Sequence, residues 1–421
     1  MSCPVQGSPV DTDDGDRFPL YAEAFTRDPH AAYEAMRVKY GALAPVELAP
    51  GIPGTLVLDH ATAVRILNDP DHFLHDPRAW QQTVPDHSPL RPMMEWYPAA
   101  RYTDGHDHVR LRQVSAAAID NVDLHALHDT VEILATPLVE SWITTGRAEL
   151  GSEYAFPLVF AVLNQALGCP EEIGQRVAAG MAARFNSTSE SEPGMEMLTT
   201  ALSDLVRLKR ARPGDDMTTR LIEHRNNLGD SEVVAQVMSF YGAGIEAARN
   251  LILNTLLLML TDDRFGGSLL SGSLSTRDAL DEVLFNNPPM ANFCTTYPRQ
   301  PMLIGNTWLP ANQPVVISIA ACNADPVTKG DRTGNRSHLA FSAGPHACPA
   351  RTMAYQIAQD AIDYLLDLAP DIKLAVPADQ LTWRTGFFHR ALTALPVVFT
   401  VPNRPGGSQP TQQRGFQPTR G

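Results

Sequence analysis

The sequence predicts a mainly α-helical fold with a minor β region, organised as one large domain over residues 1–401. Apolar residues recur at helical spacing through much of the chain, whereas strand-like runs are short. No Gly/Ser-rich linker divides the 421 residues before their last part, so the length alone does not require two domains. Residues 402–421 have almost no apolar side chains, and we expect a disordered tail there.

The first predicted elements lie near the N-terminus. Residues 28–41 begin with Asp-Pro, a helix-start signal, and place apolar residues at helical spacing. Residues 55–60 predict a short strand, and residues 61–69 predict the helix that follows it. The segment 79–103 is rich in Pro and aromatic residues and breaks the periodicity, so we expect a long loop. Long ordered loops in compact domains are usually functional or mobile.

A long apolar helix is predicted over residues 232–261, with an interruption at the Gly-Ala-Gly sequence of residues 242–244. Gly244 is either a point of local flexibility or the site of a kink. We favour the kink, because the chemistry described below needs space over one face of this helix.

Charge and cysteine content exclude several classes of protein. The net charge of −14 argues against a nucleic-acid partner, because phosphate binding depends on Lys and Arg. The N-terminus has no signal-like apolar core, and the apolar run 251–260 is too short to span a bilayer. We therefore expect a cytoplasmic protein without membrane association. The cysteines lack metal-site spacing and are odd in number, which fits a reducing cytosol: Cys3, Cys169, Cys294, Cys322 and Cys348.

The most informative stretch is FSAGPHACPA at residues 341–350, which places Cys348 in a loop of small residues ahead of a predicted helix. Gly344 and the neighbouring alanines allow the backbone to lie flat against a large planar ligand. A helix beginning near Pro349 or Ala350 would direct N–H groups at the sulfur, and we expect a deprotonated thiolate. A buried thiolate on haem iron favours O–O cleavage. A lone cysteine is more often a small buried hydrophobic residue; the flanking pattern favours a ligand here.

Phe341, Gly344, Cys348 and Ala350 match the F-x-x-G-x-x-x-C-x-G signature of the cytochromes P-450, with Ala in place of the last Gly. The chain resembles this family over nearly its whole length. The resemblance implies the cytochrome P-450 fold, with haem b between the long central helix and the loop of Cys348, the axial thiolate and metal ligand. It also implies a monooxygenase-type oxidoreductase that uses dioxygen.

A second stretch, HDHVRLRQV, carries His108 and Arg112 where bacterial family members bind both haem propionates from a helix. Their i, i+4 spacing puts both side chains on one helical face. Taken alone, such a pair would indicate a solvated basic face. Within the resemblance, His346 could meet a propionate, and Phe341 and Gly344 complete the predicted cofactor-binding set.

The long helix departs from the family pattern. In the family, an acid followed by Thr at the kink delivers protons for dioxygen activation. This chain has Ala243, Gly244, Glu246 and Ala247, so the acid is kept and the alcohol is absent. These four residues are the predicted catalytic set, and proton delivery must use Glu246 through water or a group of the substrate.

The Glu-x-x-Arg motif of the family is also incomplete, because Glu282 is present and Phe285 replaces the Arg. A buried carboxylate without a partner is costly, so Glu282 is expected to find another cation, partial solvent or a proton. Arg332 and Arg336 are the candidate cations.

A third departure concerns the propionates. Thr296 stands where a propionate-binding Arg is common, although Arg299 lies nearby in the sequence. Haem anchoring would then depend on His108, Arg112 and His346. These changes cast doubt on ordinary hydroxylation more than on the fold.

The expected substrate pocket is rich in aromatic residues, which suits a small aromatic substrate. Core packing under the loop competes with this interpretation for each residue of the segment 79–103. The candidates are Trp80, Gln81, Met94, Trp96 and Tyr97 in that segment, Ala291, Asn292 and Phe293 after the PPM turn, and Phe387 and Phe388 near the C-terminus.

Two classes of function follow. The first is a haem-thiolate oxidase of natural-product biosynthesis; the second is a degenerate family member that acts as a partner protein. The retained Cys348 loop favours the enzyme. The missing alcohol favours radical C–C or C–N coupling of aromatic substrates, similar to family members that couple tryptophan-containing cyclodipeptides. Hydroxylation or epoxidation of a natural-product scaffold stays open.

Electrons must come from other proteins. The chain has no Gly-rich dinucleotide motif after a strand and no iron–sulfur cysteine spacing. We therefore expect external redox partners, a ferredoxin and a ferredoxin reductase, that dock near Arg110, Arg112 and Arg351.

Overall fold

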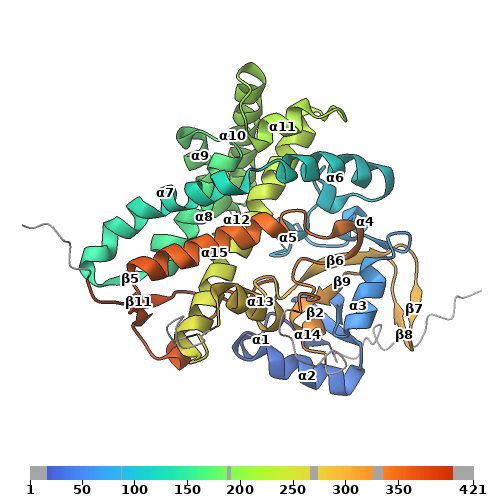
Figure 1. The fold of residues 1–421 in the computed structure, drawn as a ribbon. Helices are drawn as coiled ribbons and strands as arrows, with labels where there is room; N and C mark the ends of the chain where they lie inside the picture. The colour runs from blue at the N-terminus through green and yellow to red at the C-terminus, as the bar shows by residue number, and fades with distance from the viewer. Residues whose placement is uncertain (1–16, 87, 187–190, 266–273, 326–334, 402–421) are drawn as a thin grey trace, which may run out of the picture.

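The computed structural model describes residues 17–401, except 87, 187–190, 266–273 and 326–334. The predicted tail at 402–421 lies outside the described residues. The described part is mostly helical with a small β region, which confirms the fold class predicted from the sequence (Figure 1).

The helices are spread along the chain, with short strands between groups of them. In chain order they are α1 (Glu23–Arg27), α2 (Pro29–Tyr40), α3 (His60–Leu67), α4 (Arg78–Gln81), α5 (Arg91–Met94), α6 (Gly105–Asp120), α7 (Leu124–Trp142), α8 (Phe156–Ala166), α9 (Glu171–Asn186), α10 (Ser191–Ala211), α11 (Met217–Glu223), α12 (Asp230–Thr261), α13 (Thr276–Asn286), α14 (Ile319–Asn323) and α15 (Arg351–Leu368).

The strands are short. They are β1 (Phe18–Pro19), β2 (Leu43–Ala49), β3 (Ile52–Val57), β4 (Phe73–Leu74), β5 (Arg147–Glu149), β6 (Asn292–Pro298), β7 (Met302–Ile304), β8 (Thr307–Leu309), β9 (Val315–Ser318), β10 (Lys373–Leu374) and β11 (Pro396–Val398).

The start signals of the N-terminal helices act as predicted. The Asp28 carboxylate accepts a hydrogen bond from the Ala31 backbone N–H at 3.0 Å, and Pro29 occupies the first position of α2. The predicted strand and helix at 55–69 correspond to β3 and α3. At the start of α3, the Asp59 carboxylate accepts from the Thr62 N–H at 2.8 Å.

The main sheet has six strands in the order β1-β2-β3-β9-β6-β4. Strands β3 and β9 pair in parallel, whereas β6 pairs antiparallel with β9. The register of the β6–β9 pair shifts between Phe293 and Thr295. Such a bulge re-aims side chains, and here it brings three consecutive residues of β6, starting at Phe293, to the wall of one cavity.

Helix α12 is the centre of the helical part and packs against α8, α10, α13 and α15, which crosses in front of it in Figure 1. It is continuous from Asp230 to Thr261, so the expected interruption at residues 242–244 is absent. Gly244 instead permits close packing, because a Cβ there would lie 3.0 Å from the Leu163 side chain of α8. Helix α12 is long and apolar enough to cross a membrane, and more than half of its most apolar stretch is buried within the fold.

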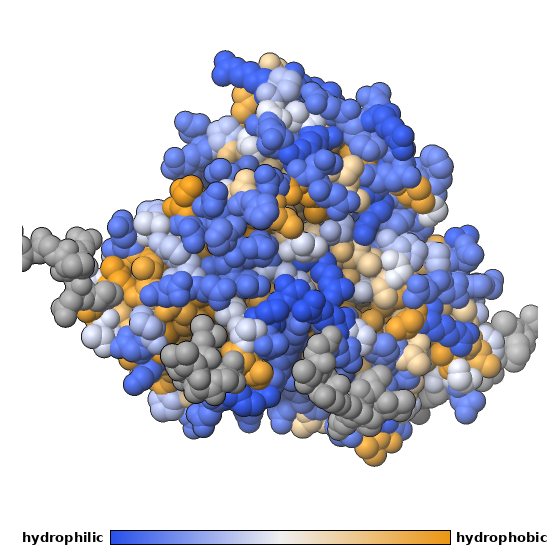
Figure 2. All heavy atoms as spheres, in the orientation of Figure 1, coloured by the Kyte–Doolittle hydropathy of each residue, from blue (hydrophilic) through white to orange (hydrophobic). Residues whose placement is uncertain are grey.

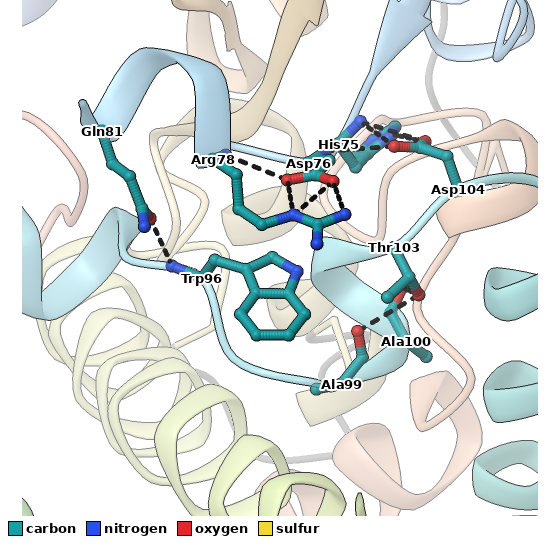
Figure 3. Close-up of polar contacts among 9 residues, drawn as sticks. All are labelled: His75, Asp76, Arg78, Gln81, Trp96, Ala99, Ala100, Thr103 and Asp104. Carbon is teal, nitrogen blue, oxygen red and sulfur yellow. Dashed lines mark hydrogen bonds and ion pairs between the residues drawn. The ribbon is translucent and has the colours of Figure 1, made fainter. Parts of the chain in front are cut away.

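The segment 79–103 is only partly a loop, because it contains the end of α4, all of α5 and a 3₁₀ turn at Ala100–Tyr102. Figure 3 shows why the segment is ordered. The Asp104 carboxylate accepts hydrogen bonds from the backbone N–H groups of His75 and Asp76, and the Arg78 guanidinium lies over the Trp96 ring at 4.8 Å.

The face of the molecule in Figure 2 is mainly hydrophilic, with hydrophobic residues in small groups. Apolar side chains instead fill three buried clusters, one among the helices and two around the sheet. The site lies where the helical cluster meets the sheet.

Candidate active site

A cavity of about 320 Å³ lies between α12, β6 and the loop of Cys348. Most of its wall is apolar. Helix α12 contributes Ala243, Gly244 and Ala247, and the facing wall contains Cys348. This is the arrangement that the resemblance implies for haem, with the long helix on one side and the sulfur on the other.

The loop of Cys348 is held in one conformation by its glycine. Gly344 has φ +70°, and a Cβ at this position would lie 2.0 Å from the Leu67 backbone oxygen at the end of α3. Only glycine fits both the backbone angle and the close approach. The Cys348 N–H then donates to the Phe341 carbonyl at 2.8 Å, which closes the loop ahead of α15.

The Cys348 sulfur is exposed to the cavity. Burial among protein atoms raises the pKa of the thiol, while the Ala350 N–H and the Arg112 charge act in the opposite direction. The backbone N–H at the start of α15 and the Arg112 charge thus favour the thiolate, as predicted, and burial opposes it. A cation bound at the sulfur would favour the thiolate further.

Three histidine rings form a stack at one end of the cavity. His346 lies between His75 and His108, with ring centroids 3.5 Å and 3.9 Å apart. Burial first, and then neighbouring positive charge, lowers the pKa of His108 to about 4, and the pKa of His346 is lowered further. All three rings line the cavity, so each can present a nitrogen to a ligand there.

The histidine stack has nitrogen atoms that could bind the haem propionates. The His108 Nε2 and His75 Nδ1 atoms are buried and have no hydrogen-bond partner among the described residues, although the Asp104 carboxylate lies 3.7 Å from His75 Nδ1. Such orphaned atoms are costly, and a carboxylate would satisfy them. The half-buried Arg112 guanidinium lines the same end of the cavity and donates to the Ala347 carbonyl of the Cys348 loop. These residues fit the acidic edge of a haem group.

The predicted catalytic residues divide into two groups. Ala243, Gly244 and Ala247 line the cavity, whereas Glu246 is absent from its wall. The Glu246 carboxylate forms an ion pair with Arg384 and accepts a hydrogen bond from the Asn250 amide. Burial raises the pKa of Glu246, but the Arg384 charge outweighs it, and the pKa lies below its ordinary value. Direct proton donation by Glu246 into the cavity therefore does not follow from this geometry.

Three of the ten predicted substrate residues, Met94, Phe293 and Phe388, lie in the cavity wall. The other seven residues lie outside the cavity wall, in agreement with the alternative that such residues pack in the core or under the loop. Trp80 is 4% exposed and packs against Tyr297. The remaining positions lie away from the described wall. The Gln81 side-chain oxygen accepts from the Trp96 backbone N–H, the Arg78 guanidinium lies over the Trp96 ring, and the Tyr97 ring contacts that of Tyr102. The Asn292 amide donates to the Tyr33 hydroxyl and the Phe387 carbonyl, and Ala291 and Phe387 are buried.

Several cavity residues were missed. Ser239 and Phe240 precede Ala243 by one turn of α12, so helical periodicity could have identified them. His75 and Arg101 could not be found in this way, because they lie on irregular segments. Thr296, the position expected to face a propionate, is fully buried and points its hydroxyl at the Val315 carbonyl. Arg299 is exposed and outside the cavity wall.

The incomplete Glu-x-x-Arg motif is resolved in an unexpected way. Glu282 is only partly buried and pairs with Arg264 at 2.7 Å. Arg336, one of the predicted partners, instead pairs with Asp281 at 3.0 Å, and Arg332 lies outside the described residues. The outward turn of Glu282 therefore removes the need for a buried cation.

Phe285 fills the interior in place of the Arg. Its ring meets the His338 ring edge to face, with centroids 5.2 Å apart, and it is 7% exposed. The His338 ring in turn lies 5.9 Å from the ring of Phe341, the first residue of the Cys348 loop. An aromatic and histidine cluster thus supports the loop from behind.

Replacing Phe285 by Ala is expected to destabilise the protein by about 3 to 4 kcal/mol, because it leaves a cavity behind the loop. Urea unfolding followed by circular dichroism measures this. Arg264→Ala, which removes the exposed ion pairs of Arg264 with Asp262 and Glu282, is the control and should cost less than about 1 kcal/mol. Phe285→Arg should also destabilise, since Glu282 is turned away; a gain in stability from this change would contradict the cluster.

Two other buried histidines make the fold sensitive to acid. Burial lowers the pKa of His338 and of His389 to about 4 in each case. An unfolded histidine titrates near pH 6.5, so the unfolded chain binds more protons below that value. The stability associated with each histidine is complete above about pH 6.5 and is lost as the pH falls towards about 4.

We therefore expect the free energy of unfolding to fall with decreasing pH in this window, with each histidine contributing up to about 1.4 kcal/mol per pH unit. His338→Gln should flatten the dependence by one proton, whereas His106→Gln, at an exposed position, should leave it unchanged. The same slope in all three proteins would show that His338 is not a cause of the dependence.

No family model matches the chain. It is 27% identical over 390 residues to a 2-hydroxy-5-methyl-1-naphthoate 7-hydroxylase of Streptomyces carzinostaticus, covering 88% of this chain and 95% of that protein. It is 26% identical over 391 residues to the cytochrome P-450 monooxygenase PikC of Streptomyces venezuelae, covering 89% and 91%. Among solved structures, CYP154C4 from Streptomyces sp. W2061 superposes with a TM-score of 0.81 and 27% identity, over 90% of this chain and 97% of that one.

These relatives agree with the geometry of the cavity. The P-450 homologues and structural neighbours imply haem with a cysteine thiolate ligand, dioxygen, and electrons from redox partners. Cys348 is the cysteine in the cavity loop that would supply such a thiolate, and the histidine stack with Arg112 would hold the propionates.

Proposed function

We propose that this chain, whose homologues are bacterial cytochromes P-450 and whose fold is theirs, is a haem-thiolate oxidase that couples aromatic substrates. The homologues include P-450 enzymes of natural-product biosynthesis. The observation that carries the proposal is the pairing of Cys348 with a helix wall that has no hydroxyl at Ala247. When bound, the haem supplies dioxygen-dependent oxidation.

The contribution of the chain is to bind, to orient and to exclude water. Ala243, Gly244 and Ala247 offer no acidic or hydroxyl side chain next to the reacting groups, and the nearby acid, Glu246, is engaged by Arg384. This stretch of α12 therefore offers no group that could deliver a proton, and the first hydroxyl of the helix in the cavity wall is that of Ser239, about one turn earlier. A reaction in which a substrate radical couples before it receives oxygen suits this wall better than oxygen insertion does.

The coupling reaction balances with the dioxygen and the electrons that the relatives are implied to use. Two aromatic C–H or N–H groups lose one hydrogen atom each, and one C–C or C–N bond forms between them. Dioxygen, two electrons from the redox partners and two protons complete the reaction, and two molecules of water leave. Hydroxylation uses the same electrons and protons but places one oxygen atom in the product.

The substrate class is aromatic because aromatic side chains meet at the cavity. Phe293 and Phe388 lie edge to face, with centroids 6.1 Å apart, and Phe240 lies across the cavity on α12. Aromatic rings pack well against such walls. Tryptophan-containing cyclodipeptides are our candidate substrates. The naphthoate hydroxylase among the relatives acts on an aromatic compound by its name, which supports the class and leaves hydroxylation as the alternative.

Bacterial P-450 enzymes generally receive electrons from a ferredoxin and its reductase, and we propose the same partners here, in the cytoplasm. Of the three cations expected at the docking face, Arg110 is paired with Glu232, and Arg112 lines the cavity. Arg351 is exposed at the start of α15 and is the one that remains suitable for docking.

Product analysis tests the proposal. The purified protein, a ferredoxin and a reductase are supplied with tryptophan-containing cyclodipeptides, and masses are measured. Coupled products, two hydrogens lighter than the sum of their precursors, are expected. Ala247→Thr restores the alcohol of the family and should raise the share of hydroxylated product. Only hydroxylated products would overturn the coupling proposal, and no turnover of any cyclodipeptide would overturn the choice of these compounds as substrates.

The haem content of the purified protein distinguishes the enzyme from the alternative, a degenerate family member that acts as a partner protein. A scaffold needs neither Cys348 at the cavity nor orphaned nitrogens at its end. Purified protein without haem would favour that alternative.

A further inference from the structure

Arg101 lies in the cavity wall and has no role in the function proposed so far. It belongs to the 3₁₀ turn at Ala100–Tyr102, between α5 and α6. Its guanidinium lies 4.1 Å from the Phe293 ring centroid and 4.9 Å from that of Tyr102. Both rings hold the cation by its face, which leaves the N–H edge available.

The N–H edge of Arg101 is poorly satisfied. Its one hydrogen bond among the described residues goes to the Met93 carbonyl at 3.5 Å, the limit of a useful distance. Among the described residues, no Asp or Glu forms an ion pair with Arg101. A guanidinium carries five donors, so several are available to a ligand.

The wall as a whole favours a negative charge. The described residues that line the cavity include two fixed cations, Arg101 and Arg112, and no Asp or Glu. Unpaired positive charge away from bulk water is costly, and an anionic ligand relieves the cost. Two carboxylate sources can reach this cavity, the haem propionates and the substrate.

The two cations contact different parts of the cavity wall. Arg112 bonds the Cys348 loop and lines the cavity together with the histidine stack. Arg101 contacts the Phe293 ring of β6 and the Met93 carbonyl. The propionates are accounted for by the end that holds Arg112 and the orphaned histidine nitrogens. Arg101 is at the end formed by the aromatic side chains.

We propose that Arg101 binds a carboxylate on the aromatic substrate, while Phe293 and Phe388 contact its ring. An Arg binds a carboxylate through two parallel hydrogen bonds, which fixes orientation as well as affinity. This inference rests on the proposed function in taking the cavity as the substrate site. It narrows the class, because a cyclodipeptide without an acidic side chain meets Arg101 only through an amide oxygen.

The test compares two ligands that differ in charge but hardly in shape, naphthalene-2-carboxylate and naphthalene-2-carboxamide. Their affinities for the holoprotein are measured by calorimetry. The carboxylate should bind wild type at least about tenfold more tightly than the amide. Arg101→Gln should remove the preference, and Arg101→Lys should retain part of it.

A matched control is Arg78→Gln. Arg78 also lies over an aromatic ring, that of Trp96 at 4.8 Å, but outside the described cavity wall and paired with Asp76. This variant should keep the full preference for the carboxylate. Equal affinities in wild type, a preference that survives Arg101→Gln, or no binding of either ligand would overturn the proposal.

The rate of haem loss shows whether Arg101 binds a haem propionate instead of a substrate carboxylate. Transfer of haem to apomyoglobin should proceed at the wild-type rate in Arg101→Gln; a several-fold faster rate would assign Arg101 to a propionate and overturn the substrate role. The carbonyl spectrum is recorded on the same sample. A missing thiolate band would count against the proposed function, and the calorimetric preference would still be read independently.

Discussion

Replacing Cys348 by Ala is expected to abolish the red-shifted, thiolate-type Soret band of the reduced carbonyl complex, together with all turnover. The sulfur faces the cavity from the loop ahead of α15, and the Ala350 N–H and Arg112 favour its charged form once a cation binds. Cys348 is the only thiol among residues 341–350, and a thiolate is the ligand that gives this band. The spectrum of the purified variant measures the loss, and far-ultraviolet circular dichroism checks that the protein is folded.

Cys294 provides the control, because it lines the same cavity from β6. Burial raises the pKa of the Cys294 thiol as it does that of Cys348. Cys294→Ala should keep the thiolate-type band. If Cys294→Ala lost the band and Cys348→Ala kept it, the axial ligand would be Cys294, and the assignment to Cys348 would be wrong.

Replacing Gly344 by Ala is expected to cost about 3 to 5 kcal/mol of stability and to lower the haem content of the purified protein. The new Cβ would lie 2.0 Å from the Leu67 carbonyl oxygen, and this backbone atom can move only by displacing α3. The residue would also be forced to keep φ +70°. Urea unfolding and the haem-to-protein absorbance ratio measure the two effects.

Gly305 is a control that separates the cost of the backbone conformation from the cost of the steric clash. It has φ +59°, and a Cβ added there would meet nothing within 4 Å, so Gly305→Ala carries only the conformational cost, about 1 kcal/mol. If the two variants lost equal stability, the contact with Leu67 would not be the reason that residue 344 is glycine.

Much of the fold was predictable because local signals were strong. The Asp-Pro start of α2, the short strand β3 and the 32-residue helix α12 each carry their own periodicity or cap. The interruption at 242–244 was not realised, because tertiary packing overrides the weak helix propensity of glycine. Gly244 sits against Leu163, and that contact is long-range.

The site was predictable where it lies on a contiguous motif and not elsewhere. The Cys348 loop and the pair His108 and Arg112 are local patterns, and the structure brings them to one cavity. The partner of Glu282 could not be predicted, because Arg264 approaches it across 18 residues of chain. Arg101 is part of an irregular segment whose side-chain directions follow from tertiary contacts.

Aromatic content proved a poor guide to the pocket for the same reason. Trp80 in α4 and Trp96 after α5 are large apolar residues, and such residues pack against whatever surface the fold offers. In this fold the surfaces are Tyr297 and the Arg78 guanidinium, and neither tryptophan lies in the described cavity wall.

The central claim is that Cys348 makes this chain a working haem-thiolate oxidase despite Phe285 and Ala247. It is tested most directly by the absorption spectrum of the purified protein, first oxidised and then reduced under carbon monoxide. We predict a red-shifted thiolate-type Soret band, and a change of spin state when an aromatic ligand is added. Protein that contains no haem, or a carbonyl complex without the thiolate band, would contradict the account.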